Sequence, residues 1–137
     1  MGETAQEILI EKADRADASA IYEIGKLCFS DAWRKETVIH DMEGSHSEYF
    51  IARMNGEIAG YGCFWFIADE GQLLNIGVRP SFRKKGIGAL LLEAGLMEAA
   101  RRHMNTLFLE VRGLRKGVYD LPKEDGYIMS RKVEGEL

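Results

Sequence analysis

The sequence has few cysteines, and they form no recognisable pattern. Cys28 and Cys63 both stand within apolar stretches. They match neither the spacing of metal ligands nor a disulfide framework, and the three histidines likewise show no ligand spacing that suggests zinc. We therefore expect two core thiols, a reducing compartment and no metal site.

Long apolar runs and an excess of positive charge are also absent. No uninterrupted apolar segment approaches the roughly 20 residues that a membrane-spanning helix needs, and the first ten residues, MGETAQEILI, lack the basic and apolar regions of a signal peptide. Lysine and arginine number 18 against 22 aspartates and glutamates, which gives a formal net charge of -4. We expect a cytoplasmic protein with no membrane partner and no direct nucleic-acid partner.

Length and composition favour one domain that spans residues 1–137. The 137 residues are 46% hydrophobic, which is enough for a single core of two or three layers. The expected strands are residues 8–13, 47–54, 57–68, 72–78, 106–111 and 127–133. The first expected helix is capped by Asp14 or Asp17 and runs to Cys28, and the others are residues 34–42 and 86–103. Asn55-Gly56 predicts a type I′ hairpin turn, and the order before the C-terminal tail is βααβββαβ.

The most informative stretch is IGVRPSFRKKGIGALL, residues 76–91, where a strand ends, a proline turns the chain and a helix begins. Gly86 and Gly88 let the backbone approach a ligand, and the free amides of the first helical turn point at it. Three cations precede this helix N-terminus, where the macrodipole disfavours positive charge unless an anion lies between them. A tight turn with solvated cations is the simpler alternative. Neither a Walker A motif nor a complete G-x-G-x-x-G is present, so a pyrophosphate-bearing cofactor of another kind is expected.

These residues carry a family resemblance. RKKGIGA, residues 83–89, resembles the R/Q-x-x-G-x-G/A motif of the GNAT acetyltransferases. NIGVRPSFRKKGIGALLLEAG followed by TLFLEVR closely resembles the ribosomal-protein-alanine N-acetyltransferases, and CFSDAW, residues 28–33, is similar to the segment between their first two helices. The resemblance covers nearly the whole chain. It implies an α/β (α+β) fold, with a mixed, mostly antiparallel sheet and helices on both faces.

The resemblance also implies a reaction and a cofactor site. Acetyl-CoA would donate its acetyl group to the N-terminal amine of a protein, the N-terminal alanine of a ribosomal protein in the enzymes most alike. Loop amides would bind the pyrophosphate, and a strand edge would pair with the pantetheine arm. The implied cofactor residues are Ile76, Gly77, Val78, Arg83, Lys84, Lys85, Gly86, Ile87, Gly88 and Ala89. The strands at residues 72–78 and 106–111 would run parallel and splay apart.

Glu110 is the candidate general base. Strand alternation puts it on one face of residues 106–112 together with Arg112, so from spacing alone it is equally well an ion-pair partner or a functional carboxylate. The resemblance favours function, because the glutamate of the matching LEVR segment is the general base of that family. An α-amine with a pKa of about 8 is largely protonated near neutral pH and needs such a base.

Aromatic residues give weaker candidates for the acceptor side. Trp33, Tyr49, Tyr61 and Trp65 could line an acceptor groove, although aromatics on helices and hairpins are more often core residues. Trp33 is favoured among them because it lies between two helices. Tyr119 is also placed on the acceptor side, because its motif position matches the family's final hairpin.

The chain departs from the family after Arg112. In the family, LEVR is followed by an asparagine, a helix and a tyrosine that is the proposed general acid, whereas Gly113 here begins a segment like the end of the final hairpin. The helix that normally follows the fifth strand is therefore lacking, through an omission or a deletion between residues 112 and 113. We expect an omission, with a Cα separation there well beyond one peptide bond. A CoA-binding module without turnover and a small-molecule amine acetyltransferase are the alternative functions.

Overall fold

The computed structural model describes the backbone of residues 7–111 and 127–132 and the side chains of residues 7–108. Its strands are β1 (Ile8–Lys12), β2 (Ser47–Met54), β3 (Glu57–Ile67), β4 (Glu70–Val78), β5 (Thr106–Val111) and β6 (Tyr127–Lys132). Its helices are α1 (Ala18–Cys28), α2 (Lys35–Met42) and α3 (Ile87–Arg101), and the short 3-10 turns are η1 (Arg15–Asp17) and η2 (Pro80–Phe82).

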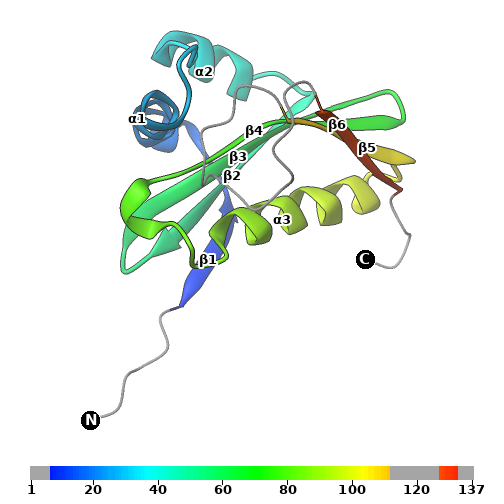
Figure 1. Cartoon of the computed structure of the whole chain (residues 1–137). Coiled ribbons are helices and arrows are strands. Elements are labelled where there is room, and N and C mark those ends of the chain that lie inside the picture. Colours follow the sequence, from blue (N-terminus) through cyan, green and yellow to red (C-terminus); the bar gives the residue numbers. More distant parts are fainter. Residues whose placement is uncertain (1–6, 112–126, 133–137) are drawn as a thin grey trace.

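The six strands form one sheet in the order β1-β2-β3-β4-β5-β6. Every neighbouring pair is antiparallel except β4 and β5, which run parallel because α3 carries the chain from one to the other. Figure 1 shows α1 and α2 on one face of this sheet and α3 along the other. The expected mixed, mostly antiparallel sheet with helices on both faces is confirmed.

The β2–β3 hairpin turns at Asn55-Gly56, as its sequence predicts. Met54 pairs with Glu57, so the loop has two residues. Both adopt positive φ, 55° at Asn55 and 79° at Gly56, which is the requirement of a type I′ turn. The tight turn fixes the register of β2 and β3 next to it.

Two apolar cores lie on opposite faces of the sheet. The core under α1 and α2 is centred on Ile21, Ile24 and Ile51, all at most 1% exposed. Asp14 caps η1, the short turn that leads into α1. Its side chain accepts a hydrogen bond from the Ala16 amide, and the Asp17 side chain accepts one from the Asp14 amide. The reciprocal cap fixes the chain direction at the entry to α1.

The larger core lies beneath α3. It is built around residues that are at most 1% exposed: Ala52, Ala59, Phe64, Ile76, Ile87, Leu91, Leu96 and Ala99. The broad apolar stripe of residues 86–103 predicted a helix lying flat on a sheet, and this is confirmed. The helix ends slightly earlier than expected, at Arg101, because His103 adopts a left-handed φ of 61°.

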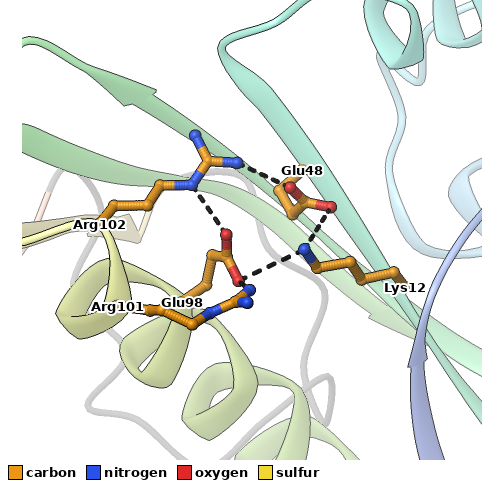
Figure 2. Close-up of polar contacts among 5 residues, drawn as sticks. All are labelled: Lys12, Glu48, Glu98, Arg101 and Arg102. Carbon is orange, nitrogen blue, oxygen red and sulfur yellow. Dashed lines mark hydrogen bonds and ion pairs between the residues drawn. The ribbon is translucent and has the colours of Figure 1, made fainter.

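A charged cluster joins the C-terminal half of α3 to the edge of the sheet (Figure 2). Glu98 is 5% exposed and accepts hydrogen bonds from Arg101 and from Arg102, the latter at 2.8 Å. Lys12 on β1 lies 3.6 Å from the same carboxylate, and Arg102 also donates to Glu48 on β2 at 2.8 Å. Burial alone would raise the pKa of Glu98, but the hydrogen bonds from Arg102 and Arg101 and the charge of Lys12 hold it below its usual range.

Two expectations concern residues that the structure does not describe. The absence of a helix after the fifth strand and the separation between Arg112 and Gly113 both fall within residues 112–126 and lie outside the described part. Beyond that gap, β6 is antiparallel to β5, with Val111 opposite Tyr127 and Thr106 opposite Lys132.

Candidate active site

The parallel strands β4 and β5 separate partway along their length. They pair only from Glu70 opposite Thr106 to Leu73 opposite Leu109. Beyond that point β4 continues to Val78 without pairing to β5. The expected parallel, splayed pair is therefore confirmed, and one edge of β4 is left without a strand partner.

The backbone of this open edge can be assigned from its neighbours. The Arg79 amide donates to Ala59 on β3 at 2.8 Å, and the Gly77 carbonyl also faces β3, since a Cβ added at Gly60 would lie 2.7 Å from it. Consecutive strand residues direct their backbone groups to opposite sides, so those of Ile76 and Val78 face away from β3. They form a short hydrogen-bonding edge beside the gap.

Gly77 has a packing role within this edge. A Cβ atom there would lie 3.0 Å from the Tyr61 ring, 3.1 Å from Ile24 and 3.3 Å from Cys28. Glycine at this position therefore lets α1 approach the sheet closely next to the open edge. This packing alone explains why the residue is glycine, without any contact to a ligand.

The loop between β4 and α3 presents a row of amides that have no partner. Within the described part of the chain, none of the backbone N–H groups of residues 84–89 donates to a backbone or side-chain acceptor. Lys84 and Gly86 adopt positive φ, 66° and 84°, and Gly86 is the N-cap of α3. Unpaired amides at a helix N-terminus favour an anion, so the geometry fits a pyrophosphate.

The three loop cations differ in what they do. Lys84 and Lys85 are exposed beside the unpaired amides. Arg83 instead turns back toward the sheet: its Nε donates to the Val78 carbonyl at 3.0 Å, and Nη2 lies 3.5 Å from Cys28 Sγ. Arg83 thus ties the loop to the end of β4, and the open edge retains the Val78 amide and both backbone groups of Ile76.

A cavity of about 430 Å³ lies between α1, the α1–α2 loop and the middle of the sheet. Five aromatic side chains line it: Tyr22, Phe29, Trp33, Tyr49 and Tyr61. Its polar lining comes from Ser30, Asp31 and Asn75, and β4 contributes both Leu74 and Asn75. The same strand therefore forms part of the cavity wall and, from the next residue, Ile76, part of the open edge.

An aspartate on α2 supports the aromatic wall. Asp41 accepts hydrogen bonds from the Tyr49 hydroxyl at 2.8 Å and from the Trp65 indole at 3.1 Å. His46 Nε2 lies 3.9 Å from the same carboxylate, and its ring meets Trp65 edge-on. Burial, together with Cys63 and Asp41, raises the pKa of Tyr49, so this phenol stays neutral.

Only some of the aromatic residues expected on the acceptor side line the cavity. Trp33, Tyr49 and Tyr61 line the cavity. Trp65 is not among its lining residues, although its ring centroid lies 6.5 Å from that of Trp33. The side chain of Glu110 and all of Tyr119 lie outside the described residues; the Glu110 backbone is placed opposite Ile128 of β6.

The described part of the chain contains both cysteines and many of the potential metal ligands. Cys28 and Cys63 are free and buried, as expected, and burial raises the pKa of the Cys63 thiol. Among the described residues, no three histidine, cysteine or acidic side chains come close enough to hold a metal ion. Residues 7–111 and 127–132 also contain no helix long and apolar enough to cross a membrane.

Asn75 was missed by the sequence analysis. A lone amide in an apolar strand was the available signal, but the strand pattern alone puts Leu74 and Asn75 on opposite faces. A bulge changes this: Cys63 pairs with Asn75 and Phe64 with Leu73, which leaves Leu74 unpaired.

Comparison with known proteins identifies the class. The chain aligns with the [Ribosomal protein bS18]-alanine N-acetyltransferase of Escherichia coli strain K12 at 29% identity over 118 residues, 86% of this chain and 79% of that one. The crystal structure of the E. coli ribosomal-protein-S18-alanine N-acetyltransferase superposes with a TM-score of 0.71 at 30% identity, over 77% of this chain and 68% of that chain.

A PaiA N-acetyltransferase from Thermoplasma acidophilum, solved in complex with coenzyme A, shares the fold with a TM-score of 0.73 at 18% identity, over 92% of this chain and 99% of that chain. Residues 18–127 match the model of the Acetyltransferase (GNAT) family. The chain belongs to that family, and as an N-acetyltransferase it uses acetyl-CoA as its cosubstrate.

Proposed function

We propose that this enzyme acetylates the N-terminal α-amine of a protein, with the N-terminal alanine of a ribosomal protein as its acceptor in the cytoplasm. Curated relatives that span most of the chain carry the name ribosomal protein bS18-alanine N-acetyltransferase. The observation that chiefly supports the proposal is the dual position of β4, whose Leu74 and Asn75 line the cavity while Ile76 and Val78 face the gap beside β5. An acceptor in the cavity and a thioester at the edge would meet there.

The cofactor side of the site follows from the backbone. The amides of residues 84–89 would bind the pyrophosphate, and the exposed Lys84 and Lys85 would add charge attraction. Ile76 and Val78 would pair with the pantetheine arm as an added strand does. Ile87 and Gly88 are buried at the start of α3, so they contribute main-chain groups rather than side chains. Arg83 acts indirectly, by holding the loop against Val78.

The transfer itself needs a deprotonated amine and a stabilised oxyanion. Glu110 would take the proton from the ammonium, after which the nitrogen lone pair attacks the thioester carbon. The new C–N bond forms, the C–S bond breaks and CoA leaves as a thiolate. The nitrogen, positively charged after attack, loses its second proton, which protonates the thiolate. The Val78 amide, which faces the gap, would donate to the oxygen on which negative charge develops.

Three acceptor assays and one binding measurement separate this proposal from its alternatives. CoA release and product mass are measured with acetyl-CoA and an Ala-initiated peptide, with the same peptide blocked at its N-terminus, and with a panel of small amines. Acetylation of the free peptide but not of the blocked one supports the proposal. Turnover with small amines alone would establish a small-molecule acetyltransferase instead. Tight CoA binding by calorimetry without any turnover would establish a binding module.

A further inference from the structure

Two buried polar atoms in the described structure have no hydrogen-bond partner: Ser47 Oγ and Asn75 Oδ1. Leaving a buried polar atom unpaired is unfavourable, so each needs an explanation. Ser47 lies at the start of β2 and does not line the aromatic cavity. Asn75 does line it, which makes a ligand in the cavity the natural partner for its carboxamide.

The β4 bulge is what brings Asn75 to the cavity. Because Leu74 has no partner on β3, Leu74 and Asn75 both reach the α1 face, while Leu73 and Ile76 on either side pack under α3. A bulge commonly re-aims a side chain next to an active site. Here it puts an uncharged acceptor one residue before Ile76, where the open edge begins.

Several other polar groups of the cavity are already hydrogen-bonded or exposed to solvent. The Tyr49 hydroxyl donates to Asp41, and Ser30 and Asp31 are exposed on the α1–α2 loop. Asn75 differs from them because its Oδ1 is buried and its carboxamide makes no side-chain hydrogen bond within the described residues. Rotation about χ2 is soft for asparagine, so Oδ1 can turn toward a donor at little energetic cost.

We propose that the Asn75 carboxamide accepts a hydrogen bond from the α-amine of the acceptor and thereby orients the amine's lone pair toward the thioester. The proposal deepens the proposed function and rests on it. A neutral primary amine has two N–H donors besides its lone pair, so holding one of them on Asn75 restricts the direction of attack. Asn75 takes no proton and makes no covalent bond; it is an orienting residue, distinct from the base.

The test compares two variants that each remove one unpaired polar atom. Asn75→Leu keeps a similar volume, and Ser47→Ala is the matched control away from the cavity. Both should unfold at the wild-type temperature or slightly above it, because each loses an unsatisfied group. Only Asn75→Leu should lower kcat/KM for the Ala-initiated peptide, by about 10- to 100-fold, the loss expected when a substrate N–H is left unpaired.

Two further readouts separate orientation from other roles. CoA affinity by calorimetry should be unchanged in Asn75→Leu. The shape of its kcat/KM against pH should match the wild type, because asparagine does not titrate. A kinetic loss no larger than that of Ser47→Ala would overturn the proposal, as would a parallel fall in stability and CoA affinity. Failure of the proposed function itself would be recognised differently, as wild-type enzyme that does not acetylate the peptide at all.

Discussion

Gly95 on α3 packs directly against the ring of Phe64 on β3, and a Cβ atom at position 95 would overlap that ring. Phe64 is fully buried and stacks on Phe66, with ring centroids 6.2 Å apart, so it has little room to move. The absence of a side chain at Gly95 therefore lets α3 pack closely on the sheet over Phe64.

Gly95→Ala should destabilise the protein despite alanine's better helix propensity. The propensity gain is about 1 kcal/mol, whereas overpacking a close-packed core costs about 1–3 kcal/mol. Because the added Cβ would overlap a fully buried ring, the overpacking cost should lie in the upper part of that range. We therefore expect a net loss of roughly 1–2 kcal/mol in the free energy of unfolding, measured by urea denaturation. Met97→Ala on the exposed face of the same helix should change it by less than about 0.5 kcal/mol. Equal stability of Gly95→Ala and wild type would show that Phe64 can move aside.

The Glu98 cluster predicts a pH dependence of stability. The pKa of the Glu98 carboxyl is lowered in the folded state. Its contribution to the free energy of unfolding is therefore complete above the unfolded pKa of about 4.5 and is lost as the pH falls through the folded value. Near pH 7, Glu98→Gln should cost about 1.5–3 kcal/mol, the usual range for hydrogen bonds to a charged group. The difference from wild type should stay constant above pH 4.5 and shrink below it.

Glu93→Gln is the control for this experiment, because Glu93 is exposed on the same helix. Urea denaturation at several pH values between 3 and 7 should give nearly the same curve for Glu93→Gln and wild type. If Glu98→Gln also parallels wild type throughout, the charged cluster contributes nothing to folding.

The loop should bind CoA through its main chain. Gly86→Val forces a β-branched residue into φ 84° and should weaken CoA binding far more than Lys85→Ala, which removes only an exposed charge. Gly56→Val is the matched control: Gly56 also has positive φ, 79°, and like Gly86 has no atom within 4 Å of an added Cβ. Both glycine variants should lose about 1–2 kcal/mol of stability from backbone strain, but only Gly86→Val should lose CoA affinity by calorimetry. A larger loss in Lys85→Ala would mean that charge attraction, not the amide row, holds the cofactor.

Local patterns predicted most of the fold because each element carries its own signal. The Asn55-Gly56 turn, the apolar stripe of α3 and the proline after β4 depend on neighbouring residues only, and the structure reproduces them. The β4 bulge could not be predicted, because it depends on how β3 pairs across Cys63 and Phe64. Arg83 is a similar case. Its position before the helix predicted that the side chain binds an anion. In the structure its guanidinium instead contacts the Val78 carbonyl on β4 and Cys28 Sγ on α1, and neither contact can be read from the neighbouring sequence.

Glu110→Gln tests the general-base role by its pH dependence. The acceptor amine has a pKa of about 8, so below that pH most of it is protonated and a base is required, whereas above it the amine is already deprotonated in solution. The loss in kcat/KM should therefore be greatest near neutral pH, about 100-fold or more, and should diminish progressively as the pH rises past 8. Glu70→Gln is the matched control, since Glu70 is an exposed carboxylate at the closed end of the same strand pair, opposite Thr106, and its removal should leave the profile unchanged. A loss that is the same at every pH would contradict proton abstraction by Glu110 and would leave it a structural role, because a group that only supports the strand has no reason to matter less once the amine is neutral.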